Sequence, residues 1–395
     1  MNDKKTQGQS RVIGMDLHPS CFSASALLNT NNAATAIVQW THDKVKYNTL
    51  QKWAMKHLLS TDIVVIEAGS NSFNCAGKLK ELDICCIVLE SYSASKIGKA
   101  YLKNDKIDSI KLARAYISGL AREVWQPDKK TMQRREILSL YTFAKKNSVK
   151  SQNRLTSWCT QHGIQRPKSM TWKKKNARDW VLKQLNWVPI QKILINNMFD
   201  SLVFYQNQRK ELEKYMANDV MSDKQLIKLL QISGIRHITA FAIGAVVGDI
   251  SRFRNPKKLV AYVGLCPKVD ESGINKKQRH LCKTGRKDLR SILVQGAHAV
   301  IKQDPAFNRF ARWGQHIQFK KNKNIAVIGI ARKMIVAVWY LLRGFTPEVK
   351  ELTDHIRIKV SKIGSVIGKQ SIKEQGYSTI KAYMEEKSKY IIGTT

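Results

Sequence analysis

The order of strand-like and helix-like segments in the amino-terminal third of the chain constrains its fold more than any other feature. Three short apolar segments, separated by turn-forming residues, predict an antiparallel meander. Helical and strand-like segments then alternate, so the predicted order is β-β-β-α-β-α-β-α. The expected strands are residues 11–17, 22–28, 35–40, 63–66 and 84–89, and the expected helices cover 49–59, the segment that ends at 82 and the region after 89.

This order resembles the ribonuclease H and RuvC-like nuclease fold, in which the first and fourth strands lie side by side at the centre of the sheet. Asp16 lies near the end of the first predicted strand, and Glu67 ends the fourth. Neighbouring strands are about 5 Å apart, so the resemblance implies that these two carboxylates lie close enough to bridge a metal ion.

Two further acids, Asp105 and Asp108, lie at the start of a predicted helix and project from one face of it. In the ribonuclease H and RuvC-like fold the final helix packs beside the central strands. The resemblance therefore implies one pocket for all four acids. Hard oxygen ligands suit Mg²⁺ or Mn²⁺, and such a pocket is typical of a two-metal site. Each acid alone is also explained as a helix cap or a strand-end residue.

The charge of the chain indicates a polyanionic partner. The sequence has 68 Lys and Arg against 30 Asp and Glu, a formal net charge of +38, which is more than solubility requires. The most apolar stretch, residues 325–342, contains Arg332 and Lys333 in its middle, so we expect no membrane association. Nucleic acid is therefore the favoured partner.

The amino terminus and the cysteines bear on where the chain works. The first residues are polar and have no apolar core of a signal peptide, so we expect a cytoplasmic protein. The 7 cysteines form neither a disulfide framework nor a metal-ligand spacing.

The middle of the chain, residues 126–224, has apolar residues at helical spacing and is predicted to form long helices. These helices form either a coiled-coil arm that pairs chains or a solvated basic face, and the sequence leaves both open. Within the basic segment 171–176, Trp172 is a candidate for stacking on a nucleobase.

A helix, a Gly-containing turn and a second helix are predicted over residues 226–246. This pattern resembles the helix-hairpin-helix module, whose backbone amides contact DNA phosphates. An ordinary helical hairpin in a protein core is the alternative.

Residues 269–277 are predicted to form a polar, flexible loop that contains Ser272 next to a glycine. A loop Ser-Gly is usually only a turn, and a serine nucleophile needs a base or metal to take its proton. Here a basic segment follows, whose cations suit the charge that develops on phosphorus. The candidate nucleic-acid-binding residues are Lys276, Lys277, Arg279, Lys283, Arg286, Lys287 and Arg290, together with Trp172.

Two sets of motifs resemble one family, the DEDD-type insertion-sequence transposases of the IS one-ten group, which also contains the Piv-type DNA invertases. The amino-terminal motifs are residues 14–18, 65–68 and 104–108, and the carboxyl-terminal motifs are residues 262–267, 271–273, 283–285 and 289–290. Both sets occur in the family's order, and the resemblance covers nearly the whole chain.

The resemblance implies a magnesium-dependent recombinase in which Asp16, Glu67, Asp105 and Asp108 hold metal, and Ser272 attacks DNA to form a covalent phosphoserine intermediate. It also implies donor and target DNA as substrates, a structured bridge RNA as guide, and a homo-oligomer, dimer or tetramer, in which the serine of one chain joins the acids of another. The alternative is a RuvC-like nuclease that uses water as its nucleophile. A basic nucleic-acid-binding protein without activity is the third reading.

We therefore expect four regions along the chain. Residues 8–125 form an α/β RuvC-like domain with the ribonuclease H fold. Residues 126–224 form a helical, coiled-coil linker. Residues 225–345 form a mainly α-helical transposase domain with the helix-hairpin-helix and the serine, and residues 346–395 form a tail without a recognisable role.

Overall fold

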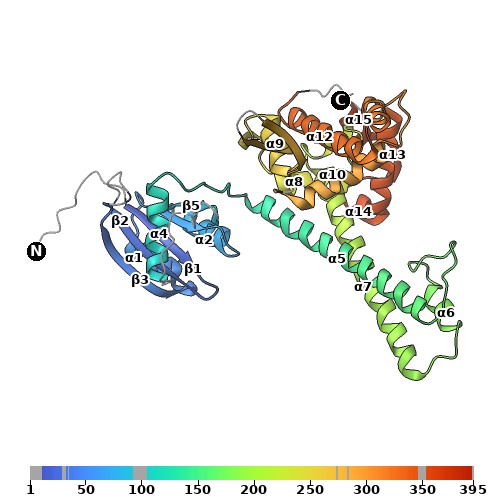
Figure 1. The fold of residues 1–395 in the computed structure, drawn as a ribbon, viewed down its shortest axis with the longest axis horizontal. Helices are drawn as coiled ribbons and strands as arrows, with labels where there is room; N and C mark the ends of the chain where they lie inside the picture. Colours follow the sequence, from blue (N-terminus) through green and yellow to red (C-terminus); the bar gives the residue numbers. More distant parts are fainter. Residues whose placement is uncertain are drawn as a thin grey trace, which may run out of the picture. The chain divides into compact units, whose positions relative to one another are not determined.

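The computed structural model (Figure 1) describes residues 11–28, 33, 35–91, 105–272, 275–282, 284–345 and 353–393. For residues 105–106, 268–272 and 275–280 it describes the backbone and not the side chains. The chain divides into two compact units, residues 1–127 and 128–395, and each unit is described by itself.

A five-stranded sheet forms the centre of the first unit, with the strand order β3-β2-β1-β4-β5. The first and fourth strands are neighbours, as the sequence predicts. β1 pairs in parallel with β4, and β4 with β5, whereas β1–β2 and β2–β3 are antiparallel. The strands are β1 Arg11–Leu17, β2 Cys21–Leu28, β3 Val38–Lys46, β4 Ile63–Glu67 and β5 Cys85–Leu89.

The third strand was predicted at residues 35–40, and this placement is wrong because β3 spans Val38–Lys46. β3 lies at the edge of the sheet, and more than half of its residues are exposed, including Asp43 and Lys44. An edge strand of this kind has no continuous apolar run, so its sequence resembles that of a loop.

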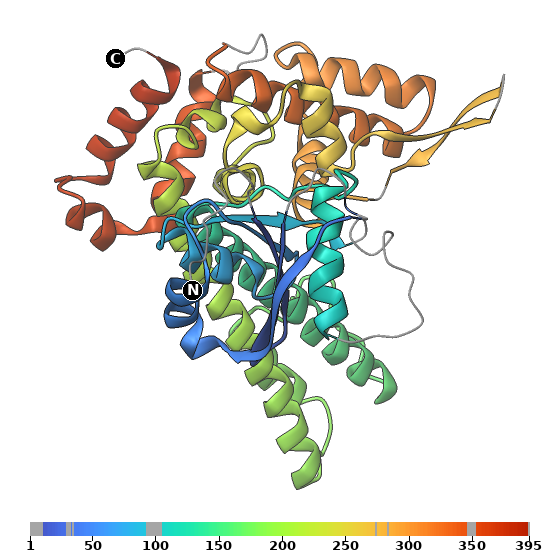
Figure 2. The same cartoon turned by 90° about the vertical axis from the view of Figure 1, so that its left-hand side faces the viewer.

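Helices cover both faces of this sheet. Alternate residues of β1 point to opposite sides, and Ile13 and Met15 pack in one core with α1 Leu50–His57 and α2 Ser72–Lys80. Val12 packs in a second core with α4 Asp105–Ile117, whose Ala113 is fully buried. The first unit is therefore a mixed α/β structure, which agrees with the predicted class (Figure 2).

Two long helices, α5 Lys129–Gln161 and α7 Pro189–Ser222, lie side by side in the second unit and form a helical arm (Figure 1). Between them the chain forms the short helix α6 Ala177–Leu182. A separate small core, rich in tryptophan and including buried Trp172 and Trp187, holds α6 and the adjoining loops against the two long helices.

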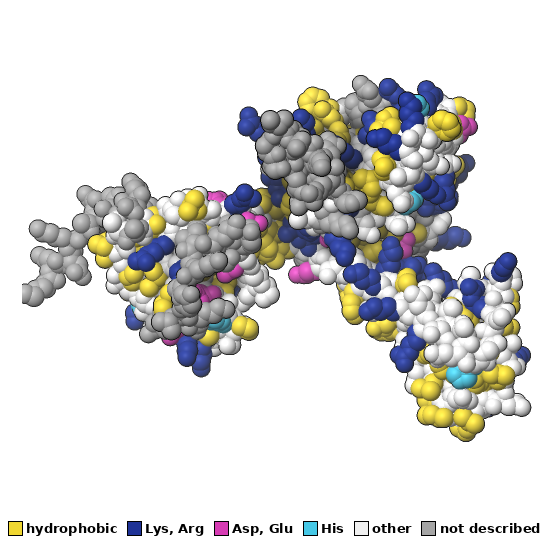
Figure 3. Space-filling view, in the orientation of Figure 1, with side chains coloured by type: hydrophobic (Ala, Val, Ile, Leu, Met, Phe, Trp, Pro, Cys, Tyr) yellow, Lys and Arg dark blue, Asp and Glu magenta, His cyan; other side chains and the backbone are white. Residues whose placement is uncertain are grey.

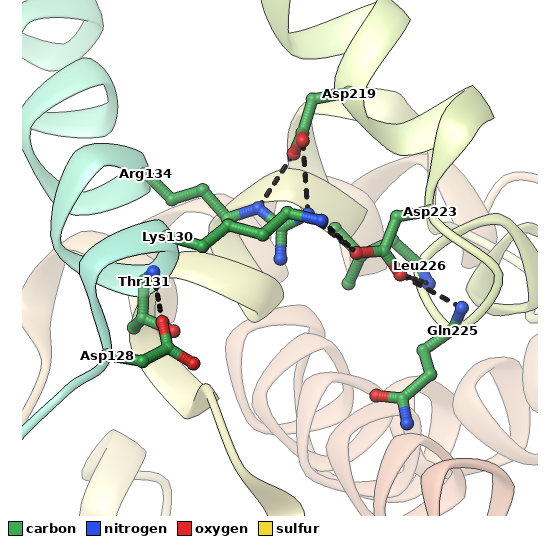
Figure 4. A network of polar contacts seen from close by, with 8 residues as sticks. All are labelled: Asp128, Lys130, Thr131, Arg134, Asp219, Asp223, Gln225 and Leu226. Atoms are coloured by element: carbon green, nitrogen blue, oxygen red, sulfur yellow. Dashed lines mark hydrogen bonds and ion pairs between the residues drawn. The ribbon is translucent and has the colours of Figure 1, made fainter.

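A buried guanidinium joins the start of α5 to the end of α7 (Figure 4). Arg134 donates from Nε to Asp219 at 2.7 Å and from Nη2 to Asp219 at 3.1 Å and to Asp223 at 2.7 Å. The Arg134 side chain is 10% exposed. Because a bidentate, desolvated ion pair has a defined geometry, this contact sets the register of the two helices.

Asp223 accepts further hydrogen bonds at this contact between α5 and α7. Lys130 Nζ donates to its Oδ2 at 3.0 Å, and the backbone N–H groups of Gln225 and Leu226 donate to its Oδ1. Burial alone would raise the pKa of Asp223, but the hydrogen bonds from Arg134, Lys130 and these amides outweigh it and hold that pKa well below its usual range.

The rest of the second unit packs around α8 His237–Val247, of which every residue except Ile238 is buried. The helix predicted before it is wrong: residues 227–231 form only the 3-10 turn η2 Ile227–Gln231. The turn at Gly234 has φ +81°, and an added Cβ would lie 2.6 Å from a methyl group of Val300. The turn therefore packs closely against α10 Lys287–Val300 and α12 Lys323–Leu342, and contact of its backbone amides with DNA phosphates stays a prediction.

The predicted tail folds onto the same core. Its helices are α13 Thr353–Ile367, α14 Lys369–Glu374 and α15 Ile380–Ile392. Their buried residues in this core are Ile356, Val360, Ile372, Tyr383 and Ile391. The remaining elements are η1 Tyr47–Thr49, η3 Ile250–Arg252, α9 Pro256–Val263, β6 Pro267–Ser272, β7 Asn275–Leu281 and α11 Arg309–Lys320.

One helix of the described residues, α12, is long and apolar enough to cross a membrane by length and composition. In this structure it packs through Ile330, Met334 and Val338 into the core of the second unit. Its apolar character is therefore explained by packing within the chain.

Candidate functional site

The ends of β1 and β4 bring two predicted acids together. Met15 of β1 pairs with Ile66 of β4, and Asp16 and Glu67 each follow by one residue on these neighbouring parallel strands. Neighbouring strands lie about 4.8 Å apart. The Asp16 side chain is 20% exposed, and its Oδ2 lies 3.3 Å from Nε2 of His18. Glu67 is partly exposed, so solvent reaches both carboxylates.

Helix α4 packs directly on the strand that carries Asp16. An added Cβ at Gly14 would lie 1.8 Å from the carbonyl oxygen of Ser109 and 2.8 Å from the backbone nitrogen of Ala113. The Ser109 hydroxyl lies 2.7 Å from the hydroxyl of Ser25 on β2. Because Gly14 and Asp16 are two residues apart on a strand, both belong to the face that α4 covers.

The same helix carries the other two acids. Asp105 is its first residue, and its side chain lies outside the described part of the structure. Asp108 precedes the buried Ser109, is 37% exposed, and accepts a hydrogen bond from Lys111 Nζ at 2.8 Å. The structure thus places Asp16, Glu67 and α4 in one α/β unit.

The oxygen donors at the ends of β1 and β4 suit a hard divalent cation. Among the described side chains, no group of three or more His, Cys, Asp or Glu lies close enough to hold a metal ion. Two carboxylates at adjacent strand ends are the ligand type that Mg²⁺ and Mn²⁺ prefer. The pocket of four acids stays a prediction.

Ser272 lies in a β-hairpin and not in the predicted flexible loop. β6 and β7 pair antiparallel, and Ser272 of β6 pairs with Asn275 of β7. The loop prediction was wrong because the charged residues of these strands gave no apolar alternation. The side chain of Ser272 lies outside the described part, so its role as nucleophile stays a prediction.

Two glycines hold the base of this hairpin against α9. An added Cβ at Gly264 would lie 2.2 Å from the carbonyl oxygen of Thr284, and one at Gly285 would lie 2.4 Å from the carbonyl oxygen of Tyr262. Both glycines have positive φ, +75° and +97°. These positions therefore require glycine for space and for backbone conformation.

Two of the predicted phosphate-binding cations have partners within the protein. Arg286 donates to both oxygens of Asp288, at 3.1 and 2.6 Å. Arg290 Nη1 donates to the carbonyl oxygen of Val263 at 3.0 Å. These contacts brace the base of the hairpin, and contact with a phosphate stays a prediction for both residues.

The other predicted cations are less constrained by the structure. Lys287 is exposed at the start of α10. The backbone register places Lys276 opposite Glu271 and Lys277 opposite Asp270, the cross-strand arrangement that stabilises hairpins. The side chains of Lys276, Lys277 and Arg279, and all of Lys283, lie outside the described residues.

The structure corrects the proposed role of Trp172. Its side chain is buried in the small tryptophan-rich core, with 5% exposure, and its indole N–H donates to Thr156 Oγ1 at 2.8 Å. A stacking platform needs an open ring face. Trp172 is therefore a structural residue of the helical arm.

Sequence reasoning missed a groove of about 400 Å³ between α5 and α7. Its cationic residues are Lys150 and Arg154, and its aromatic residues are Trp158 and Tyr205. The signal for it was the four-residue spacing of Lys150, Arg154 and Trp158, which lie on one face of a helix.

Comparison with known families is consistent with the carboxyl-terminal motifs. Residues 227–312 match the model of the transposase IS116/IS110/IS902 family. The matched segment contains α8, α9, the β6–β7 hairpin with Ser272, and α10.

Related proteins are named as transposases or as a gene-inverting protein. The chain is 29% identical over 154 residues to a probable family 20 transposase of Pseudomonas aeruginosa, covering 38% of this chain and 44% of that protein. It is 24% identical over 155 residues to the transposase for insertion sequence element IS1111A of Coxiella burnetii, covering 39% and 43%. It is 34% identical over 126 residues to the pilin gene-inverting protein of Moraxella lacunata, covering 31% and 38%. The chain spans about half the length of the curated relatives it matches, or less.

Proposed function

This chain belongs to the IS110-type transposase family, and from that premise we propose that it is a DNA transposase or site-specific recombinase of an insertion sequence. The observation that carries the proposal is the match over residues 227–312, because this segment includes the hairpin with Ser272. The relatives include both transposases and a gene-inverting protein, so DNA strand exchange is the chemistry common to their names.

The first unit supplies the acidic part of the proposed site. Its sheet order, with adjacent first and fourth strands, supports a RuvC-like fold with Asp16 and Glu67 as ligands of Mg²⁺ or Mn²⁺. Asp105 and Asp108 of α4 would complete the ligand set. A bound divalent cation supplies Lewis-acid stabilisation of charge on the phosphate oxygens.

The second unit supplies the proposed nucleophile. Ser272 Oγ would bond to phosphorus as the phosphodiester bond to the departing DNA strand breaks, which leaves DNA attached to the protein. The attachment conserves the energy of the broken bond, so the strand can be rejoined to a new partner without an external energy source. Water as the nucleophile, as in a RuvC-like nuclease, leaves no attached DNA.

Guidance by RNA and assembly of several chains are further parts of the proposal. The net charge of +38 supports a protein that neutralises more than one nucleic acid at once. We propose donor and target DNA, a structured bridge RNA, and a homo-oligomer, dimer or tetramer, as the complete complex. We also propose a cytoplasmic location, which agrees with these partners.

The nucleophile is tested by trapping attached DNA. Purified protein is incubated with Mg²⁺, labelled donor and target DNA and the RNA transcribed from the flanking region, and the products are separated under denaturing conditions. We expect a protein–DNA adduct that Ser272→Ala abolishes and that Ser222→Ala, at an exposed position at the end of α7, leaves intact. Cut DNA without an adduct, at equal rates in both variants, would establish the water mechanism instead.

The guide is tested in the same reaction. Omitting the RNA, or replacing its target-pairing segment, should abolish or redirect the adduct in the wild-type protein. An adduct that forms at the same DNA site without RNA would show that the protein reads the DNA directly.

A further inference from the structure

The groove between α5 and α7 combines three kinds of side chain that suit one class of ligand. Its α5 wall carries Asn147, Lys150, Ser151, Arg154 and Trp158. These residues repeat at intervals of three and four, so they form a single row along the helix. The row runs from Asn147 to Trp158, which is twelve residues, so its ends lie about 16 Å apart at the helical rise of 1.5 Å per residue.

The α7 wall adds neutral hydrogen-bonding groups and a second aromatic ring. Asn197 and Ser201 are exposed in the groove, and Tyr205 is partly exposed. Leu194 and Met198 complete this wall. The groove therefore has cations on one side and uncharged polar groups on both.

An aromatic cluster lies at each end of the groove. The Trp158 ring lies 4.1 Å from His162 and 4.8 Å from Trp187, measured between ring centroids. The Tyr205 ring lies 6.1 Å from Phe143, a side chain that is 53% exposed. These packed clusters hold Trp158 and Tyr205 in position, and each keeps an accessible part in the groove.

The surrounding charge is strongly positive. Between Tyr141 and Gln208 the sequence has twelve Lys and Arg but only two acids, Asp179 and Asp200. Asp200 forms an ion pair with Arg178, and none of the described residues that line the groove is acidic. Figure 3 shows Lys and Arg side chains on this arm, next to hydrophobic patches.

We propose that this groove binds a single-stranded segment of nucleic acid. Lys150 and Arg154 contact consecutive phosphates, and unpaired bases stack on Tyr205 and on the exposed part of Trp158. A duplex is a poorer occupant because its bases are already stacked with one another and offer no free face to the rings. This proposal deepens the proposed function, since it gives one of the nucleic acids a binding site. The groove shares no residue with the Ser272 hairpin, so its binding is measured separately from adduct formation.

The cationic wall is tested with matched charge removal. Binding of the full-length protein to labelled single-stranded DNA, single-stranded RNA and duplex DNA of one sequence is measured by fluorescence anisotropy over a range of salt concentrations. Lys150→Gln with Arg154→Gln should weaken single-strand binding roughly tenfold. The slope of log K against log salt concentration should become shallower by about 1.4, which is about 0.7 for each lost phosphate contact. The control, Lys183→Gln with Lys192→Gln, removes the same charge from exposed residues outside the groove and should leave the slope unchanged.

Stacking on Tyr205 is tested by a substitution that leaves the charge unchanged. Tyr205→Leu should weaken single-strand binding by roughly ten- to a hundredfold and leave duplex binding nearly unaltered, because only unpaired bases use the ring. Circular dichroism and thermal unfolding show whether each variant keeps its fold. Tighter binding of single-stranded RNA than of single-stranded DNA would indicate that the groove binds a segment of the guide RNA. Equal affinities would indicate that it accepts an unpaired strand of either nucleic acid.

Two results would overturn the proposal. Equal loss of affinity in the groove pair and in the control pair would show that only total charge matters. Wild-type affinity in all variants, with a change of molar mass in light scattering, would show that the groove is a contact between chains. The adduct assay with Ser272→Ala is separate, so failure of either proposal leaves the other standing.

Discussion

The acid-bearing sheet of the first unit and the helical arm of the second are held together by different means. In the first unit, the α4 backbone touches β1 because Gly14 has no side chain. In the second unit, a buried guanidinium, Arg134, joins residues of α5 and α7 that are more than eighty positions apart in sequence. The first contact exists because Gly14 has no Cβ, and the second exists because charged groups are paired. The first unit should therefore respond to added side-chain volume, and the second to loss of a charge or to a change of pH.

The largest expected effect is on chemistry in the first unit. Asp16→Asn keeps the size of the side chain and removes its charge, so a divalent cation is held far less tightly and adduct formation should fall by orders of magnitude. The control is Asp83→Asn, a turn residue with φ +58° that asparagine also accepts, next to the start of β5 and away from the ends of β1 and β4. Adduct yields are measured by denaturing gel, and equal yields in both variants would exclude Asp16 from the site.

The largest expected loss of stability is in the second unit. Arg134→Met leaves Asp219 and Asp223 without their buried partner and should lower the free energy of unfolding by about 3–5 kcal/mol. Lys130→Met removes an ion pair from a side chain that is 59% exposed and should cost less than about 1 kcal/mol. Urea unfolding followed by tryptophan fluorescence compares the two, and similar losses would mean that burial of Arg134 is unimportant.

A smaller loss of stability is expected in the first unit, where α4 packs closely on β1. Gly14→Ala puts a methyl group against the backbone of Ser109, and the displacement of α4 should cost about 1–3 kcal/mol. The matched change Gly77→Ala, at a helical position with nothing within 4 Å, should be neutral or slightly stabilising. Hydrogen exchange localises the effect, and unchanged protection of α4 in Gly14→Ala would contradict the packing argument.

The smallest expected effect is the pH dependence of the second unit. Because the pKa of Asp223 is lowered in the folded state, its contribution to stability is present above the unfolded pKa of about 3.9 and is lost as pH falls below it. Stability should decline between about pH 5 and pH 2, and the decline should be shallower in Asp223→Asn. A decline of equal steepness in that variant would assign the effect to other carboxylates.

Sequence patterns located the elements that are buried along their whole length. β1 was predicted at its observed bounds, because Val12 to Met15 are covered on both faces and form a continuous apolar run. The adjacency of β1 and β4 was implied by the resemblance of the element order to the ribonuclease H and RuvC-like fold. The hairpin around Ser272 and the edge strand β3 were missed or misplaced, since polar residues dominate both.

Side-chain roles were harder to predict than elements. Trp172 and Trp158 are both tryptophans near basic residues, and nothing local distinguishes Trp172, which is buried, from Trp158, which is partly exposed. Arg286 and Arg290 have the composition of a phosphate site, but their guanidinium groups are engaged by Asp288 and by Val263. Exposure and partners depend on residues that are distant in sequence.

The sequence by itself determined the charge, the α/β order of the first unit, the acids at the ends of two strands and the family motifs, because these properties depend on residue type and local spacing. Only the tertiary structure decided that residues 353–393 complete the core of the second unit and that α5 and α7 enclose a basic groove. The physical reason is that burial and pairing depend on contacts between distant segments, which a local pattern does not contain.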